Sequence, residues 1–137
     1  MGNERYYRRK RFIYALVFPT GGVYIGQSVN LKRRWSEHAS FKGGWGNLRF
    51  KPYYLFDAHC TFAEAEDLEQ AYRVLAREKG YFVYGLPQVV VNPHSRATEW
   101  HYRQAKRLPW PVKRPRQKSY WQSAMEFLRR SLRKLWA

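Results

Sequence analysis

The sequence predicts an α/β domain that is followed by a basic helical extension. Residues 12–26 have the pattern of a β-hairpin, because two apolar runs of strand length flank a Pro-Thr-Gly-Gly turn. Residues 61–80 have the apolar periodicity of an amphipathic helix that starts with a capping box. Residues 120–136 place apolar and basic side chains on different sides of a second amphipathic helix.

The predicted hairpin begins the domain, and a short helix follows it. The strands cover residues 12–18 (FIYALVF) and 23–26 (VYIG). Asn30 is a suitable N-cap for the helix. One stripe of this helix, at the spacing i, i+3, i+4 and i+7, consists of Leu31, Arg34, Trp35 and His38. We therefore expect Arg34 and His38 to point the same way, either inward or into a cleft.

The middle of the chain continues with a glycine-rich basic loop over residues 41–51 and a segment compatible with a strand over residues 52–58. Thr61 opens the clearest helix, and Gly80 is its expected end. A buried strand over residues 88–91 (QVVV) follows. The apolar stripe of the helix consists of Ala65, Leu68, Tyr72, Leu75 and Ala76.

The charge is high and unevenly spread. Of a net charge of +16, residues 1–95 supply +6 (14 Lys or Arg, 8 Asp or Glu) and residues 96–137 supply +10 (12 and 2). Such an excess favours a polyanion partner through counterion release, and nucleic acid is the chief candidate. An acidic protein or an anionic membrane surface is the alternative. The single cysteine, Cys60, and the lack of a signal peptide or a membrane-spanning run predict a cytoplasmic protein.

Composition divides the chain into three predicted parts. Residues 1–95 form the compact domain, residues 96–118 a basic Pro-rich linker, and residues 119–137 a basic amphipathic helix. The apolar side of this last helix suits packing on the domain, a protein partner or dimer contact, or a membrane surface. These alternatives stay open, although a membrane is the less favoured partner.

Several polar residues could carry chemistry, and each also has an ordinary structural explanation. An inward-facing Arg34 needs an anion, and a phosphate matches the geometry of the guanidinium fork. The structural alternative is an arginine that extends past Trp35 to solvent or pairs with a core carboxylate. His38 alone is more often a structural histidine. Glu69 lies at the edge of the apolar arc of its helix, where it could face a cleft and bind Mg²⁺ together with waters and a substrate phosphate. The structural alternative is an ion pair between Glu69 and Arg73.

Tyr14 and Tyr24 lie on one face of the hairpin if a three-residue turn sets Phe18 opposite Gly22. A slip of one residue would place them on opposite faces. A phenol near a cation loses its proton more easily and can activate a water molecule. The register of the hairpin therefore decides whether the two tyrosines can act together.

The order of these residues resembles the GIY-YIG nuclease family. Its members have a Gly-Ile-Tyr strand, then a Tyr-Ile-Gly strand, then a helix with Arg and often His, then a Glu on a later helix and an Asn after a terminal strand. This chain matches them over about residues 11–93, although Phe12 replaces the first glycine. The matching positions are Ile13-Tyr14, Tyr24-Ile25-Gly26, Arg34, His38, Glu69 and Asn92.

The resemblance implies a small, mostly antiparallel three-stranded sheet flanked by helices. It also implies hydrolysis of DNA phosphodiester bonds with one Mg²⁺ or Mn²⁺ ion. Glu69 would bind the metal, and Tyr14 or Tyr24 would act as the base for the attacking water or orient that base.

The same resemblance gives roles to three further residues. Arg34 would stabilise the pentacovalent phosphate. His38 would take part in proton transfer, and Asn92 would hold the site together or contact a phosphate. The alternative function is a nucleic-acid-binding module on the same fold with weak or lost catalysis.

Overall fold

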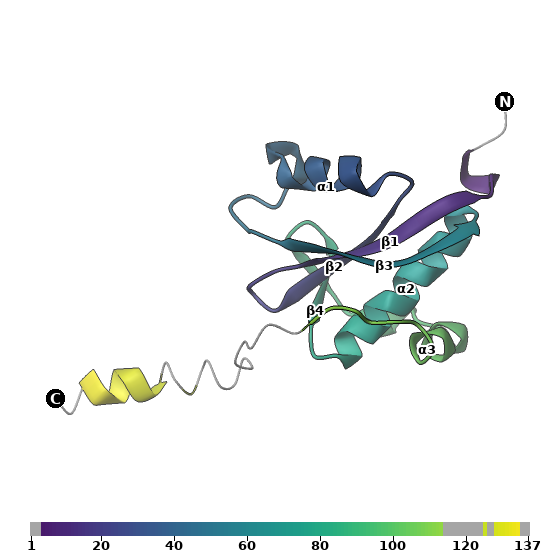
Figure 1. The fold of residues 1–137 in the computed structure, drawn as a ribbon. Helices are drawn as coiled ribbons and strands as arrows, with labels where there is room; N and C mark the ends of the chain where they lie inside the picture. Colours follow the sequence, from purple (N-terminus) through teal and green to yellow (C-terminus); the bar gives the residue numbers. More distant parts are fainter. Residues whose placement is uncertain (1–3, 114–124, 126–127, 135–137) are drawn as a thin grey trace.

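The computed structural model describes residues 4–113, 125 and 128–134. A five-stranded sheet with helices on both faces forms its centre (Figure 1). The strands are β1 (Arg9–Val17), β2 (Gly22–Ser28), β3 (Lys51–Cys60), β4 (Phe82–Leu86) and β5 (Val89–Val91). The α-helices are α1 (Leu31–Ala39), α2 (Phe62–Glu78) and α3 (Glu99–Ala105). Short 3₁₀ helices are η1 (Glu4–Tyr6), η2 (Phe41–Gly43) and η3 (Pro93–Arg96).

The α/β class is as predicted, but the prediction of three strands is wrong. The five strands lie in the order β3-β1-β2-β4-β5, and within the described residues all neighbours are antiparallel except β2 and β4. β3 pairs with β1 along its whole length. β4 and β5 are too short to show a strong alternation, and β4 is held by parallel pairing with a strand far away in the sequence.

The β1–β2 hairpin has the register that brings the two tyrosines together. The Phe18 N–H donates to the Gly22 carbonyl at 2.9 Å, across a three-residue turn. The register pairs Tyr14 with Gly26. Because side chains alternate between the faces of a strand, Tyr14 and Tyr24 share one face of the sheet.

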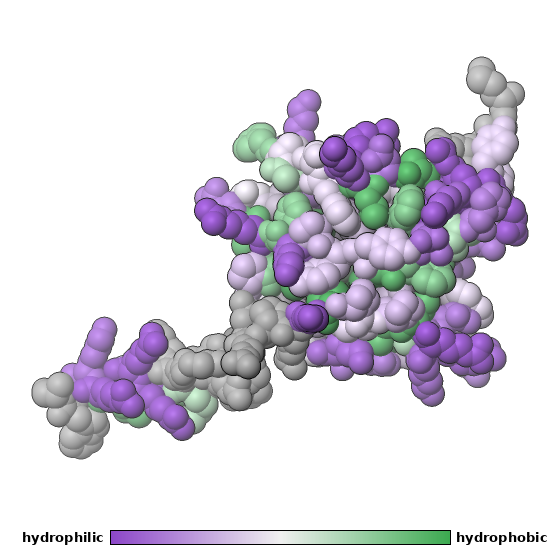
Figure 2. Space-filling model, viewed as in Figure 1, coloured by the Kyte–Doolittle hydropathy of each residue, from purple (hydrophilic) through white to green (hydrophobic). Residues whose placement is uncertain are grey.

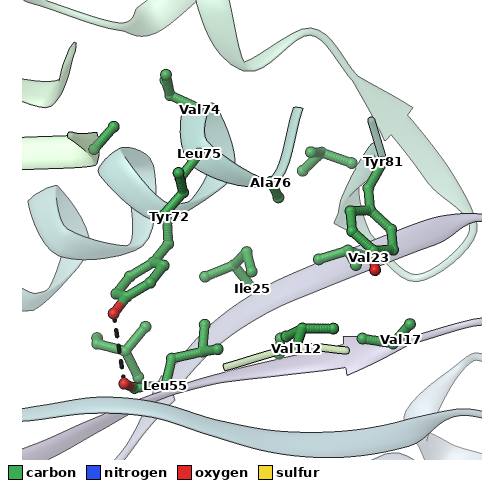
Figure 3. Packing of buried hydrophobic residues seen from close by; sticks show 14 of the residues in the cluster. Val17, Val23, Ile25, Leu55, Tyr72, Val74, Leu75, Ala76, Tyr81 and Val112 are labelled. Atoms are coloured by element: carbon green, nitrogen blue, oxygen red, sulfur yellow. Dashed lines mark hydrogen bonds between the residues drawn. The ribbon is translucent and has the colours of Figure 1, made fainter. Parts of the chain in front are cut away.

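Each face of the sheet has its own core. The face under α2 and α3 packs the odd-numbered residues of β1 against α2, with Ile13, Ala15, Val17, Val23, Ile25, Leu55, Tyr72, Val74 and Leu75 in one cluster (Figure 3). The face under α1 holds a second, aromatic cluster of Tyr14, Leu16, Phe18, Trp45 and Tyr84. β1 therefore supplies both cores, which explains why its apolar run is continuous rather than alternating.

Both predicted helix caps are present. The Asn30 Oδ1 accepts the Arg33 N–H at 3.0 Å and starts α1. At the start of α2, the Thr61 Oγ1 accepts the Glu64 N–H at 3.2 Å and the Glu64 Oε1 accepts the Thr61 N–H at 3.1 Å. These caps set the first turn of each helix and so fix the rotation of the residues that follow.

The predicted linker over residues 96–118 is structured in its first part. α3 packs against α2, and its Ala105 is only 2% exposed. The His101 Nδ1 accepts the Thr98 N–H at 2.9 Å, which leaves Nε2–H to donate to Asp67 at 3.0 Å. These bonds cap α3 and tie it to α2, so this segment belongs to the domain.

Residues 109–113, which we call the strap, complete the core under α2. The Tyr72 hydroxyl donates to the Pro109 carbonyl at 3.0 Å, and the Trp110 ring centroid lies 6.4 Å from that of Tyr72. Val112 is 7% exposed and belongs to the same cluster (Figure 3). The compact domain therefore extends to residue 113 rather than ending at residue 95.

Most of the predicted C-terminal helix, residues 119–137, lies outside the described residues. Residues 128–134 are helical, and hydrophilic side chains cover much of this segment in Figure 2. Its basic residues are Arg129, Arg130, Arg133 and Lys134, all exposed. Within the part of the chain that the structure describes, none of the helices has the length and apolar character that crossing a membrane requires.

Candidate active site

Four of the six predicted site residues meet on the α1 face of the sheet. The Tyr14 oxygen lies 2.7 Å from the His38 Nε2, and the Arg34 Nε donates to the same oxygen at 3.3 Å. The Tyr24 ring centroid lies 6.3 Å from that of Tyr14 and 5.2 Å from that of His38. β1, β2 and α1 thus bring two phenols, an imidazole and a guanidinium into one cluster.

The hydrogen bonds of His38 fix its tautomer. The Trp45 Nε1–H donates to the His38 Nδ1 at 3.1 Å, and an indole nitrogen can only donate. The proton of the neutral ring is therefore on Nε2, which donates it to the Tyr14 oxygen. Burial, and then the nearby Arg34 charge, lower the pKa of His38 to about 4, so the ring is neutral at pH 7.

The Tyr14 oxygen accepts two N–H donors, from His38 and from Arg34. The hydroxyl proton of Tyr14 must therefore point in a third direction, away from His38 and Arg34. Burial and the neighbouring Tyr24 raise the pKa of Tyr14 well above its ordinary value, although the Arg34 hydrogen bond opposes the shift. Tyr14 is accordingly a protonated phenol at neutral pH, held in place by two donors and able to donate its O–H.

Gly26 makes room for the Tyr14 ring. The two residues are cross-strand partners, and a Cβ at position 26 would overlap the ring and the hydroxyl of Tyr14. A glycine in a strand often marks such a close approach. The glycine of the Tyr-Ile-Gly sequence thus leaves the space that the Tyr14 ring of the neighbouring strand occupies.

Gly26→Ala is expected to destabilise the fold by about 1–3 kcal/mol, because the buried Tyr14 ring would have to move. Urea denaturation of the two proteins measures the change in the free energy of unfolding. The same substitution in a Tyr14→Ala background is the control, and it should cost much less. An equal cost in both backgrounds would show that the Tyr14 ring is not what excludes a side chain at position 26.

Arg34 lies between the buried cluster and solvent. Its Nε donates to Tyr14 and its Nη1 donates to the Glu37 Oε2 at 3.0 Å, while 40% of its side chain is exposed. Burial lowers the pKa of Arg34, but the hydrogen bonds to Tyr14 and Glu37 outweigh burial and raise it. Nη2 has no hydrogen bond to any described residue, so it is available to a bound anion.

A hollow of about 330 Å³, which we call the arginine hollow, opens beside Arg34. Its lining contains four arginines and one acid, namely Arg5, Arg11, Arg33, Arg34 and Glu37. Glu37 already forms ion pairs with Arg33 and Arg34. The hollow therefore carries net positive charge and suits a phosphate group, whose oxygens match the guanidinium fork.

Glu69 reaches this region from α2, which covers the other face of the sheet. Gln27, near the end of β2, lines the arginine hollow and donates to the Glu69 Oε2 at 3.5 Å. Only 12% of the Glu69 side chain is exposed, and Arg73 lies 4.0 Å away. Burial raises the pKa of Glu69 to about 7, against the opposing effects of Arg73, Gln27 and Arg34. Glu69 and Arg34 thus interact electrostatically across the end of β2.

The surroundings of Glu69 fit a hard cation. Burial makes the ionised carboxylate unfavourable, and a bound cation would offset that cost. In the residues that the structure describes, no three His, Cys, Asp or Glu side chains form a ready-made metal site. A metal ion at Glu69 would therefore complete its ligand shell with waters and a substrate phosphate, as Mg²⁺ commonly does.

Asn92 lies outside this cluster. Its side-chain oxygen accepts the His94 N–H at 3.1 Å and caps η3. It lines a different hollow together with Arg77 and Phe82, and that hollow shares no lining residue with the arginine hollow. The contact that Asn92 makes is that of a helix cap, which differs from the role that the family resemblance implies.

Two residues of the site are absent from the sequence-based predictions. Trp45 is 2% exposed and orients His38, although it lies in a segment whose glycines indicate a flexible loop. Gln27 joins Glu69 to the arginine hollow. The only signal for Trp45 is a large apolar residue among glycines, and Gln27, next to the Tyr-Ile-Gly sequence, has no distinguishing pattern.

A family model described as the GIY-YIG catalytic domain matches residues 10–82, just over half of the chain. Comparisons with curated proteins and with solved structures gave no significant match. The matched stretch contains both tyrosines of the cluster, α1 with Arg34 and His38, and Glu69, and it ends before Asn92. The resemblance seen in the order of the motifs is confirmed: the chain belongs to the GIY-YIG catalytic domain family, a family of nucleases.

Proposed function

We propose that this protein is a DNA endonuclease that hydrolyses phosphodiester bonds with one divalent metal ion. One observation carries the proposal: Arg34 touches the Tyr14 hydroxyl, lines the arginine hollow and interacts with the buried Glu69 carboxylate. A phosphate that enters the hollow would thus meet Arg34, whose guanidinium also contacts the Tyr14 phenol and lowers the pKa of Glu69.

Each group has a role that follows from its contacts. Arg34 binds the phosphate through its free Nη2 and stabilises the charge that builds on the phosphate oxygens. His38 acts through Tyr14, because its Nδ1 accepts from Trp45 and its Nε2–H is donated to the phenol. The Tyr24 hydroxyl has no hydrogen bond to any described residue, so it is the phenol available to orient the attacking water.

Glu69 would hold one Mg²⁺ or Mn²⁺ ion. Such an ion, when bound, supplies positive charge that stabilises the phosphate as a fifth oxygen is added. Glu69 must be ionised to bind it, and the pKa of Glu69 is about 7. Metal binding would therefore release a proton from Glu69 and weaken as the pH falls below 7.

The charge distribution supports DNA as the substrate. The chain carries a net charge of +16, and the described residues place four arginines around one hollow beside the cluster. Neutralising phosphates with Lys and Arg releases condensed counterions, which favours binding at low salt.

A cleavage assay on duplex, single-stranded and branched DNA tests the proposed function. We expect cleavage with Mg²⁺ or Mn²⁺ and none with EDTA. Cleavage that persists in EDTA would rule out the metal-dependent reaction. DNA binding without cleavage under any metal condition would instead indicate a binding module on the same fold.

Deleting residues 114–137 is expected to weaken DNA binding and flatten its salt dependence. The deleted segment contains seven Lys or Arg and one Glu, but none of the clustered site residues. Each phosphate that the truncated protein no longer neutralises should reduce the slope of log affinity against log salt by about 0.9 on duplex DNA. Fluorescence anisotropy over a salt series measures the slope.

The truncation point after Lys113 keeps the strap in place, since a cut before residue 109 would remove Trp110 and the buried Val112. Cleavage at low salt and high enzyme concentration should persist in the truncated protein. An unchanged salt slope would show that residues 114–137 do not contact DNA.

A further inference from the structure

Two aromatic rings border the cluster of Tyr14, Tyr24, Arg34 and His38 on its β3 side. Phe12, which stands where the family motif has its first glycine, lies on the same face of β1 as Tyr14. Tyr54 of β3 is the cross-strand partner of Tyr14. The ring centroids of Phe12 and Tyr54 are 6.3 Å apart with an interplanar angle of 64°. We call this pair the aromatic platform.

The aromatic platform is more accessible than the buried members of the aromatic cluster on this face. Tyr14 is 0% exposed, whereas Tyr54 is 45% exposed and Phe12 is half-buried. The Tyr54 hydroxyl donates to Asp57, which fixes the direction of the ring. A fixed and open aromatic ring on a sheet beside a phosphate site is well suited to stacking a nucleobase.

A basic side chain accompanies the aromatic platform. The Lys10 Nζ lies 5.4 Å from the centroid of the Phe12 ring and 3.9 Å from the Asp57 carboxylate. Lys10 is 63% exposed, and exposed ion pairs contribute little to stability. Lys10 is therefore free to leave the ring and bind a phosphate when a base takes its place.

Tyr14 connects the aromatic platform with the phosphate-binding side of the site. Its backbone pairs with Tyr54 on one side, and its hydroxyl accepts from Arg34 on the other. A nucleotide bound here would place its base on the platform and a neighbouring phosphate at Arg34. A base inside a duplex has both faces covered by its neighbours, so only an unstacked base can bind in this way.

We propose that Phe12 and Tyr54 stack an unpaired nucleobase of the cleaved strand, so that the preferred substrate is DNA with a single-stranded segment at the cleaved phosphate. This inference rests on the proposed nuclease function and adds the substrate class to it. The family motif has glycine at the Phe12 position, so the platform is a feature of this chain rather than of the motif.

Oligonucleotides that carry 2-aminopurine test the inference, with binding measured in EDTA to prevent cleavage. We expect wild-type protein to bind single-stranded DNA more tightly than a duplex of the same sequence, with quenching of the 2-aminopurine fluorescence. Phe12→Leu and Tyr54→Leu keep apolar volume but remove a ring, and each should weaken single-strand binding about tenfold and reduce the quenching. Duplex binding should change little.

Two further variants serve as controls. Phe12→Tyr retains a ring and should bind like the wild type, which separates loss of stacking from a general disturbance of β1. Trp100→Leu removes an exposed ring from α3, on the opposite face of the sheet, and should have no effect. Thermal unfolding by circular dichroism confirms that each variant is folded.

The outcomes distinguish this inference from the proposed function. Wild-type protein that neither binds nor cleaves DNA would reject both. Wild-type protein that cleaves DNA, while Phe12→Leu and Tyr54→Leu retain single-strand affinity and quenching, would reject the aromatic platform alone. A preference of the wild type for duplex DNA would also reject it.

Discussion

Glu69→Gln is expected to abolish DNA cleavage, to leave DNA affinity nearly intact, and to raise the melting temperature of the metal-free protein at pH 8. Glutamine has almost the same volume but cannot bind a metal ion as a carboxylate does. Burial raises the pKa of Glu69 from an ordinary 4.5 to about 7, so the fold favours the neutral acid. The wild-type protein must carry a buried charge at pH 8, and the variant does not.

The size of this stability effect depends on pH, and its sign does not change. Below pH 4.5, Glu69 is neutral in both the folded and the unfolded chain, and the variant gains nothing. Between pH 4.5 and 7 the unfolded chain loses its proton first, so the wild-type protein loses stability relative to the variant. Above pH 7 the difference is complete and stays constant.

Thermal unfolding in EDTA at pH 4.5 and pH 8 measures this effect. Adding Mg²⁺ at pH 8 should stabilise the wild-type protein but not the Glu69→Gln protein. Glu66→Gln is the matched control, because Glu66 lies on the same helix with a 49% exposed side chain. It should not change cleavage, and it should keep most of the pH dependence of stability, because the Glu66 charge adds a smaller part than burial to the raised pKa of Glu69. Cleavage by the Glu69→Gln protein would remove Glu69 from the metal site.

Arg34→Ala is expected to lower the rate of cleavage by about 10²–10³-fold, the usual effect of removing a group that stabilises a transition-state charge. The substitution also removes the Nε–H that holds the Tyr14 oxygen. Single-turnover kinetics at saturating enzyme separate the chemical step from binding. Arg34→Lys should remain impaired, because an ammonium cannot contact the phenol, Glu37 and a phosphate through one planar fork.

Arg33→Ala is the control for Arg34→Ala, since both arginines pair with Glu37 and both line the arginine hollow. The Arg33 side chain is 64% exposed, and the hydrogen bonds of the Tyr14 hydroxyl within the described residues go to His38 and Arg34 instead. Its loss should weaken DNA binding and leave the single-turnover rate nearly unchanged. A larger effect on turnover from Arg33→Ala than from Arg34→Ala would show that the wrong arginine has been assigned.

The half of the site on β1, β2 and α1 could be predicted because its determinants are local. The Pro-Thr-Gly-Gly turn sets the register that joins Tyr14 with Gly26, and the Asn30 cap sets the rotation of the helix that carries Arg34 and His38. Glu69 could be chosen from the acids of its helix by its place at the edge of the apolar arc.

The remaining features depend on contacts between distant segments. Trp45 is buried because Phe18, which follows β1, and Tyr84 of β4 pack against its ring. β4 joins the sheet by parallel pairing with β2. A strand as short as β4 has no sequence pattern that predicts this pairing. The strap is buried although its two prolines and its basic neighbours are typical of a linker. The apolar periodicity of a short segment does not show which distant segments it packs against.

The burial of the strap also has a consequence for how the enzyme is made. A ribosome delivers Tyr14, Arg34 and then Glu69 early, but the inner side of α2 is completed only by Trp110 and Val112. The Tyr72 hydroxyl of a nascent chain that ends before residue 109 has no Pro109 carbonyl to bind. We therefore expect the inner side of the helix that carries Glu69 to be fully packed only after the ribosome has delivered the strap, which follows Glu69 by about 40 residues of sequence.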